Sequence, residues 1–318
     1  MQEIGIRSGH RTIMADGPKH LGHQNPRRIP SRRMATAISV NQLAVSFPGR
    51  GKKAAVHALK ALDLQVEKGR IVGVLGPNGS GKTTLLRVLA GLQKPTSGSV
   101  TMLGEAPQHP SLIQRVAYQS EGELPLAVLS APEYLAFLGA ELGLSNQESD
   151  RRAAALLDRL ELRHAKSRRI RTFSTGMCKR LALAGALLAE PEVLLLDEPT
   201  AGLDPFGTAT VMAILRELTD KGTAILMASH HLLEVEEICD EVLLLYEGAV
   251  HARGTLQDLL ATDEQSLIVR GLDVGAMGEL AEDAKKRGGE VVRIERPRDH
   301  LFALFRRLGS NKDQEGQS

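Results

Sequence analysis

Near residue 80 the chain runs Gly76-Pro77-Asn78-Gly79-Ser80-Gly81-Lys82-Thr83-Thr84. This stretch matches G-x-x-x-x-G-K-[ST], the pattern of a phosphate-binding loop. An apolar run at 71–75 precedes it and predicts a buried strand, and residues 84–90 continue with helical spacing. The motif therefore stands between a strand and a helix, as it must, which argues against the alternative of a chance match. The stretch predicts that the protein binds a nucleotide.

Three features would let this loop hold a polyphosphate. Its glycines allow the backbone to curl so that successive N–H groups point inward and form a nest for anions. The helix that follows adds the positive end of its dipole. We expect the Lys82 ammonium to reach the β- and γ-phosphates and the Thr83 hydroxyl to ligate Mg²⁺.

The bulk composition narrows the classes of function. A chain of 318 residues with 42% hydrophobic content can form one large domain with an appendage. A net charge of +2, with no Trp and 3% aromatic residues, argues against a nucleic-acid binder. Cys178 and Cys239 lie far apart without metal-like spacing, which suits a reducing compartment. No apolar run approaches the roughly 18–20 residues that span a bilayer, so a membrane role would require a partner.

The N-terminal residues 1–36 differ from the rest of the chain. They place basic residues among His, Gly and Pro with little apolar periodicity, so we interpret them as a disordered basic extension. They contain no apolar core of a secretory signal. Two alternatives remain open, namely a true initiator at Met34 and a basic tail that touches anionic lipid or nucleic acid.

The C-terminal residues 261–309 predict a small accessory domain of mixed α/β type. Its expected elements are strands at 266–269 and 290–294, a helix at 279–287 and an amphipathic helix at 300–308. From the residues alone we expect a stabilising cap. The polar residues 310–318 are predicted to be a disordered tail.

Between these ends, residues 37–260 predict one α/β domain. Partial alternation at 38–47 and 56–66 indicates two antiparallel strands. Residues from about 124 to 175 are rich in helix patterns and lack the strands found on either side, which predicts an inserted helical subdomain. Further expected elements are strands at 114–119, 193–196, 223–228 and 241–246, and helices at 179–188, 205–218 and 232–238.

Two carboxylates follow one of the apolar runs. Residues 193–196 predict a buried strand, and Asp197 and Glu198 come directly after it. Ligands of open α/β sheets bind at the carboxyl ends of the strands, so one carboxylate can hold Mg²⁺ and the other can polarise a water. Helix capping by acidic residues is the structural alternative. The phosphate-binding loop in the same chain makes that alternative the minor one.

Four weaker signals remain ambiguous from the residues alone. Gln119 ends a short predicted strand, where it is either a surface residue or a metal contact. His230 follows a later strand and could donate to a γ-phosphate. Phe47 ends the first strand, where core packing and stacking on an adenine are equally compatible with the spacing. Ser174 to Met177 form a small-residue loop before the helix predicted from Lys179, which is in principle a second anion site.

Taken in order, these motifs resemble the nucleotide-binding domain of an ABC (ATP-binding cassette) ATPase over about residues 38–260. The resemblance implies an α/β P-loop NTPase fold with a mixed-sheet core, an antiparallel β subdomain, a helical subdomain and a small C-terminal α/β appendage. It also implies ATP and Mg²⁺ as cofactors. The appendage resembles the small C-terminal appendage of some exporter ATPases, which implies a dimer-stabilising or regulatory role as the alternative to a stabilising cap.

The resemblance assigns roles to individual residues around the phosphates. The stretch that begins at Gly76 is similar to the Walker A loop. Gln119 resembles the Q-loop glutamine, which touches Mg²⁺ and senses the γ-phosphate. Asp197 resembles the Walker B metal carboxylate, and Glu198 resembles the general base that activates the attacking water.

Other roles concern the base of the nucleotide and a second subunit. Phe47 takes the position of the A-loop aromatic residue, which favours stacking on adenine, while Asp204 falls in the D-loop and His230 resembles the switch histidine. Ser174-Thr175-Gly176-Met177 stands where the family has Ser-Gly-Gly-Gln. Ser174 and Gly176 keep the donors that cap the γ-phosphate across a dimer, so we expect an active site despite the two departures.

The resemblance implies the ATP-hydrolysing subunit of a membrane transporter. The Ser-Thr-Gly-Met form is similar to that of exporter ATPases with a separately encoded permease, although import is not excluded. The expected partners are a second copy of the chain, which encloses ATP head to tail, and the permease, which would hold the protein on the inner face of the cell membrane.

The alternative is a soluble ABC ATPase with a regulatory, DNA-repair or translation role. Repair members carry long coiled-coil insertions between the Gln119 and Ser174 positions, and translation members carry two cassettes. Neither feature is present in this sequence.

Overall fold

The computed structural model describes residues 7–8, 11–12, 35–49, 55–122, 124–260 and 273–291. The chain divides into two units, Met1–Met34 and Ala35–Ser318. In the first unit, β1 (Arg7–Ser8) pairs antiparallel with β2 (Arg11–Thr12). Residues 1–6, 9–10 and 13–34 of the predicted basic extension lie outside the described residues, as do the predicted strand at 266–269, the helix at 300–308 and the tail at 310–318.

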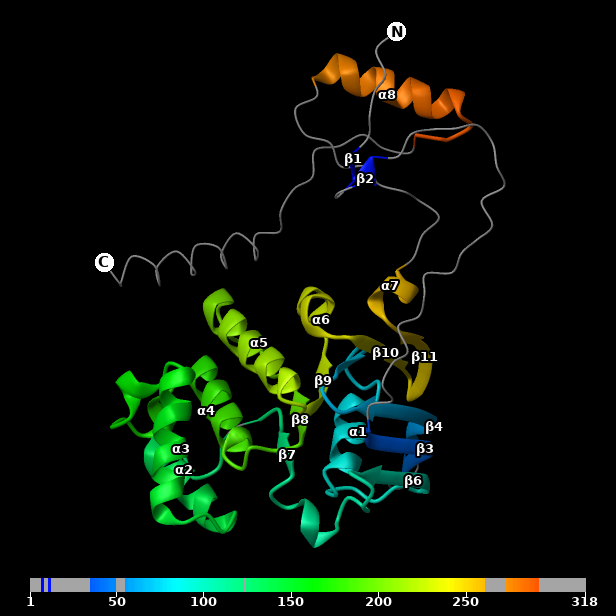
Figure 1. Ribbon diagram of the computed structural model, residues 1–318. Coiled ribbons are helices and arrows are strands. Elements are labelled where there is room, and N and C mark those ends of the chain that lie inside the picture. The colour runs from blue at the N-terminus through cyan, green and yellow to red at the C-terminus, as the bar shows by residue number, and fades with distance from the viewer. Residues whose placement is uncertain are drawn as a thin grey trace, which may run out of the picture. The chain divides into compact units, whose positions relative to one another are not determined.

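A six-stranded sheet forms the centre of the second unit (Figure 1). Its order is β11 (Ala249–Gly254), β10 (Glu241–Tyr246), β5 (Ile71–Leu75), β9 (Ala224–Ser229), β8 (Val193–Asp197) and β7 (Val116–Gln119). The hairpin of β10 and β11 is antiparallel, and all other pairs are parallel. The sheet is therefore mixed, as predicted. Because β5, β8 and β9 are buried along their whole length, they have the continuous apolar runs typical of parallel strands.

A three-stranded antiparallel sheet has the order β4 (Val56–Glu67), β3 (Thr36–Phe47) and β6 (Ser97–Met102). Its buried side chains form one core cluster with helix α1 (Lys82–Leu89) and with one face of the central sheet. Along β5 that face carries Val72 and Val74, while the neighbours Ile71 and Leu75 belong to the other cluster, as the alternation of a strand requires.

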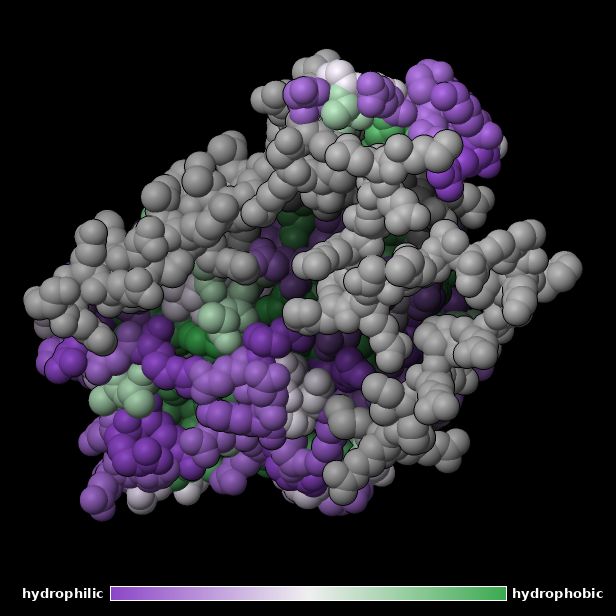
Figure 2. Space-filling model, turned by 45° about the horizontal axis from the view of Figure 1, so that its top comes forward, coloured by the Kyte–Doolittle hydropathy of each residue, from purple (hydrophilic) through white to green (hydrophobic). Residues whose placement is uncertain are grey.

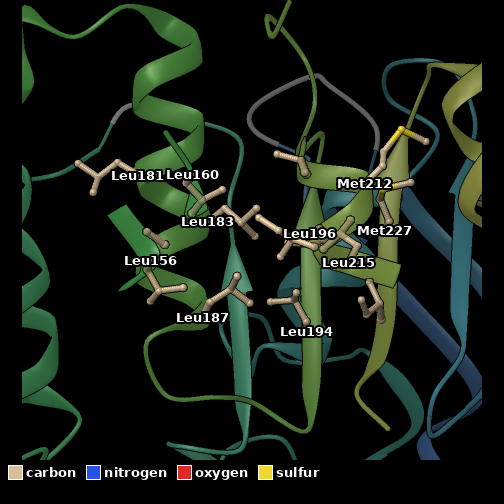
Figure 3. Close-up of a cluster of buried hydrophobic side chains, with 14 of the residues drawn as sticks. Leu156, Leu160, Leu181, Leu183, Leu187, Leu194, Leu196, Met212, Leu215 and Met227 are labelled. Atoms are coloured by element: carbon tan, nitrogen blue, oxygen red, sulfur yellow. The ribbon is translucent and has the colours of Figure 1, made fainter. Parts of the chain in front are cut away.

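The opposite face of the central sheet packs against helices. These are α2 (Ala131–Glu141), α3 (Asn146–Arg159), α4 (Thr175–Leu187), α5 (Pro205–Asp220) and α6 (Leu232–Ile238), with the 3₁₀ turns η2 (Arg163–Ala165) and η3 (Ile170–Thr172). A further 3₁₀ turn, η1 (Pro110–Leu112), packs with Leu112 into the core on the α1 side. Figure 3 shows this core: Leu183 and Leu187 of α4 lie between Leu156 of α3 and the β8 residues Leu194 and Leu196. The helical subdomain and the sheet thus share one hydrophobic core.

Helix caps explain where several of these helices begin. Ser130 and Glu133 form a capping box at α2, and the Ser145 side chain caps α3. Helix α4 begins at Thr175, because the Ser174 side chain accepts a hydrogen bond from the backbone N–H of Met177. The predicted start at Lys179 was therefore wrong, and the small-residue stretch is the first turn of the helix instead of a loop.

Two further helices follow the central sheet, α7 (Leu256–Leu259) and α8 (Val274–Lys286). Asp273 caps α8, so this helix begins before the predicted start at Glu279. Among the residues that the structure describes, no helix has the length and apolar character needed to cross a bilayer. Figure 2 shows that hydrophilic residues dominate the described surface on one face, with smaller hydrophobic areas between them.

Candidate nucleotide-binding site

The predicted phosphate-binding loop joins β5 to α1. Gly81 caps α1 with a φ of 109°, and Gly79 has a φ of 81°, both in the region that favours glycine. A Cβ at Gly76 would lie 2.1 Å from the backbone oxygen of Leu245, and one at Gly81 would lie 2.5 Å from that of Ala58. Strands β10 and β4 therefore hold the loop so closely that only glycine fits at these two positions.

Lys82 lies at the start of α1 and is 7% exposed. Its ammonium donates hydrogen bonds to the carbonyl oxygens of Gly76 at 2.7 Å and Pro77 at 3.3 Å. The buried hydroxyl oxygen of Ser80 has no hydrogen-bond partner among the described residues. The hydrogen bonds of this cation to described residues therefore go to neutral carbonyl oxygens, and an anion would bind there more strongly than a carbonyl does.

Asp197 and Glu198 lie at the carboxyl end of β8 and are 1% and 3% exposed. Burial raises the pKa of Asp197, and a hydrogen bond to the Thr83 side chain lowers it in part. The Oδ2 atom of Asp197 and the Oε2 atom of Glu198 have no hydrogen-bond partner among the described residues. Buried carboxylate oxygens without partners are costly, so their presence indicates a ligand site.

Glu198 also has an unusual backbone, with a φ of 50°. Its Oε1 atom lies 2.7 Å from Nδ1 of His230, which follows β9. The two residues are thus adjacent in space although 32 positions separate them. Strands β8 and β9 are parallel neighbours, so their carboxyl ends meet at the same edge of the sheet.

Gln119 ends β7 and is 2% exposed, which excludes the surface alternative that its sequence position left open. Neither atom of its side-chain amide has a hydrogen-bond partner among the described residues. Gln119 is paired with Leu196, the residue before Asp197. Oxygen atoms of Asp197, Gln119 and Thr83 are the ligand types that Mg²⁺ prefers, so the residues present fit that ion.

A pocket of about 420 Å³ lies between the phosphate-binding loop and these carboxylates. Asn78, Gly79, Gly81, Lys82, Thr83, Thr84, Asp197 and Glu198 line it, as do Val56, His57, Ala58, Lys60, Glu121 and Glu247. The residues of the second set were not predicted as site residues from the sequence. Its members come from the start of β4, from the residues after β7 and from the turn after β10, and only the packing of these elements brings them together.

The remaining predicted residues do not line this pocket. Phe47 is 39% exposed and is paired with Val56, which does line it. Ser174 caps α4, and Asp204 caps α5 by accepting a hydrogen bond from the N–H of Gly207 at 2.7 Å. Ser174 and Asp204 are both exposed, and Gly176 is half-buried.

The fold and the pocket agree with the comparisons with known proteins. A family model described as "ABC transporter" matches residues 59–201. The chain is 39% identical over 260 residues to the uncharacterized ABC transporter ATP-binding protein YdbJ of Bacillus subtilis, covering 79% of this chain and 82% of that protein. It is 33% identical to the doxorubicin resistance ATP-binding protein DrrA of Mycobacterium tuberculosis, covering 70% and 67%.

The chain spans less than two thirds of the length of one similar relative. The chain is 38% identical to an uncharacterized ABC transporter ATP-binding protein of Synechocystis, and the match spans 70% of this chain but only 64% of that relative's length.

Solved structures show the same similarity. The ATP-binding subunit of an ABC transporter matches with a TM-score of 0.63 and 30% identity, covering 70% of this chain and 92% of that one. The ATP-binding cassette MJ0796, in a dimeric post-hydrolysis state bound to ADP and Pi, matches with a TM-score of 0.63 and 25% identity, covering 69% and 98%. The fold and the pocket define a nucleotide-binding cassette. The chain belongs to the family of ABC transporter ATP-binding subunits.

The raised pKa of Asp197 predicts how stability changes with pH. An acid whose pKa is raised by folding stabilises the folded state only below its ordinary pKa of 3.8, and this contribution is lost as the pH rises through the raised value. We therefore expect Asp197→Asn to raise the free energy of unfolding of the nucleotide-free protein at pH 7.5. The gain should shrink as the pH falls from 7.5 to 4, close to the ordinary pKa of the group.

Urea unfolding at the two pH values measures this effect. The exposed carboxylate Asp150, replaced as Asp150→Asn, is the matched control and should change stability little at either pH. A less stable Asp197→Asn protein at pH 7.5 would contradict the burial argument.

Proposed function

We propose that this chain is the ATP-hydrolysing subunit of an ABC exporter and drives a separately encoded transmembrane permease. The observation that carries the proposal is Glu198, a buried carboxylate in the same pocket as Lys82. One of its oxygens has no hydrogen-bond partner among the described residues, and the other lies within hydrogen-bond distance of His230. A phosphate-binding loop alone would serve nucleotide binding. A carboxylate beside it can accept the proton of an attacking water.

The residues of the pocket suggest how the phosphates are bound. On ATP binding, the Lys82 ammonium would exchange the carbonyl oxygens of Gly76 and Pro77 for β- and γ-phosphate oxygens. Thr83, Gln119 and Asp197 would hold Mg²⁺, which when bound neutralises charge on the phosphates. The backbone N–H groups from Gly76 to Thr84 would complete the cradle.

Hydrolysis transfers the γ-phosphoryl group to water. The water oxygen forms a bond to the γ-phosphorus, the bond to the bridging oxygen of ADP breaks, and the proton of the water passes to Oε2 of Glu198. His230 holds Oε1 of the same carboxylate, so it orients the base and can contact the γ-phosphate. Most of the rate enhancement in such a reaction comes from positioning and charge stabilisation.

A second copy of the chain would complete the site. Ser174 and Gly176 do not line the pocket of their own chain, and Ser174 is exposed at the start of α4. We propose that they cap the γ-phosphate bound by a partner copy, with Asp204 at the same interface. The similar cassette MJ0796 is dimeric with ADP and Pi bound, which supports this arrangement. Phe47, beside Val56 at the rim, would stack on the adenine.

The export role and the permease rest on further support. One similar relative carries the name of a doxorubicin resistance protein. Apolar side chains are exposed in the segment between Gln119 and α2 and on α2 itself, with exposed fractions of 42% for Leu126, 65% for Val128 and 45% for Phe137. A permease segment that covers them would lie close to the γ-phosphate sensor and would hold the protein at the inner face of the membrane.

The domain boundaries belong to the same proposal. Residues 37–260 would form the nucleotide-binding domain, with a helical subdomain at about 124–175. Residues 261–309 would form a C-terminal accessory domain, and residues 1–36 and 310–318 would be extensions outside the folded parts.

The Glu198→Gln variant tests the catalytic assignment. It keeps the shape of the side chain and removes the base, so we expect the steady-state ATPase rate to fall about 10²–10⁴-fold while ATP still binds. ATP should then trap a dimer, detectable by size-exclusion chromatography with light scattering. Glu236→Gln, at an exposed position of α6, is the control and should hydrolyse ATP normally. Near-normal turnover by Glu198→Gln would exclude this residue as the base.

Purification from membranes tests the transport assignment. The tagged full-length chain should be retained with a multi-spanning membrane protein after detergent extraction. A charge at the exposed apolar position, as in Val128→Glu, should reduce this retention at least about tenfold and leave the basal ATPase rate unchanged. The control Leu260→Glu changes another exposed apolar residue, 60% exposed, and should not affect retention. Absence of any membrane protein from the wild-type sample would favour a regulatory, repair or translation ATPase.

A further inference from the structure

Lys179 is a buried charged residue that the proposed reaction does not use. It lies on α4 and is 9% exposed. Its ammonium donates a hydrogen bond to the backbone carbonyl oxygen of Glu198 at 3.1 Å. Burying an ammonium group is costly unless the group makes a useful contact, and replacing a buried charge by an apolar residue of similar size is often neutral. The hydrogen bond from Lys179 to Glu198 therefore indicates a role in function, since stability alone does not require a buried ammonium group here.

The carbonyl group that Lys179 holds belongs to a strained residue. Glu198 has a φ of 50°, in the left-handed region that non-glycine residues rarely adopt. The same carbonyl oxygen accepts a longer hydrogen bond from the N–H of Ala201 at 3.4 Å. The shorter bond from Lys179 thus fixes the peptide group that follows the proposed base, and with it the direction of the carboxylate.

The first turn of α4 also contacts the chain just beyond Glu198. A Cβ placed on Gly202 would lie 3.3 Å from Cγ2 of Thr175. A Cβ placed on Gly176 would lie 3.3 Å from Cδ2 of Leu203 and 3.4 Å from the carbonyl oxygen of Gly202. Thr175 replaces a glycine of the family pattern, and its methyl group packs on this turn. Helix α4 therefore holds the segment 198–203 at two points.

The far side of the same segment is held by the residues around α6. His230 contacts the Glu198 carboxylate at 2.7 Å, and the Thr200 hydroxyl donates a hydrogen bond to Glu234 of α6. The segment 198–203 thus lies between α4 and α6. Its position depends on both, because it has hydrogen bonds to each.

We propose that Lys179 is a positioning residue that couples the two ATP sites of a dimer of this chain. The inference rests on the proposed function, in which Glu198 acts on the ATP of its own chain while Ser174 and Gly176 contact the ATP of the partner. Ser174 caps the helix that carries Lys179. Because a helix moves as a rigid rod, a shift of its first turn toward the partner's γ-phosphate moves the ammonium of Lys179 too. The Glu198 carbonyl then follows, so the base is aligned when the partner site is filled.

Steady-state kinetics of two variants of the full-length chain test this coupling. Lys179→Met removes the donor and keeps the length and packing of the side chain, whereas Lys179→Arg keeps a cationic donor. We expect Lys179→Met to lower kcat about tenfold, which corresponds to the loss of one hydrogen bond from a charged donor, with KM for ATP within about twofold. The Hill coefficient for ATP, which cannot exceed the two sites of the dimer, should fall toward about 1. Lys179→Arg should retain most of the wild-type kcat and most of the wild-type Hill coefficient.

A second readout does not depend on hydrolysis. In the nucleotide-free protein, amide hydrogen exchange in a peptide covering residues 200–203 should be faster in Lys179→Met than in wild type, because the segment has lost its side-chain hydrogen bond to α4. The control Lys94→Met, at an exposed position, should change neither the exchange nor the kinetics. If Lys179→Met does not fold, Lys179→Ala replaces it with the same expected losses.

The outcomes separate this inference from the proposed function. An inactive wild-type protein would contradict the proposed function, and the exchange measurement would still decide whether Lys179 holds the segment. An active wild-type protein together with a folded Lys179→Met of unchanged kcat and Hill coefficient would overturn the coupling. So would a raised KM at constant kcat, which indicates a role in binding alone.

Discussion

The candidate nucleotide-binding site contains a group of buried polar side-chain atoms that have no hydrogen-bond partner among the described residues, and this constraint underlies the rest of the site. Gln119, Asp197 and Glu198 are each at most 3% exposed, and each has a side-chain atom with no hydrogen-bond partner among the described residues. Such atoms reduce the stability of the free protein. Their cost is offset by two large apolar cores, one on each face of the central sheet. In the proposed function, a bound metal ion and nucleotide would supply the missing hydrogen-bond and ligand partners of these atoms.

The parts of this site that are local in sequence were predictable. The glycines and Lys82 between an apolar run and a helical pattern specify the phosphate-binding loop, because the whole cradle is built by consecutive residues. Asp197 and Glu198 were predictable for the same reason, since the apolar run before them fixes their place at the end of a buried strand. The mixed sheet and the antiparallel sheet were also predictable, because consecutive residues with an apolar or alternating pattern indicate the strands.

The parts that depend on packing between distant elements were not predictable. Nothing near Glu247 or His57 indicates that they line the same pocket as Lys82, because the β10–β11 turn and the start of β4 reach it only in the folded chain. The burial of Gln119 could not be read from its strand-end position, and Lys179 had the pattern of an ordinary helix residue. The start of α4 was missed because its signal is a single capping hydroxyl, on Ser174. The roles given to these residues in a dimer remain predictions.

The proposed function requires a second copy of the chain to complete each hydrolytic site. In support of it, the exposed Ser174 lies outside the pocket that holds Lys82 and Glu198. The most direct test is the ATPase rate per mole of chain over a dilution series, with the oligomeric state followed by light scattering at saturating ATP. The account predicts that the rate per mole falls on dilution and approaches zero where the protein is monomeric. A rate per mole that stays constant across the monomeric range would contradict it.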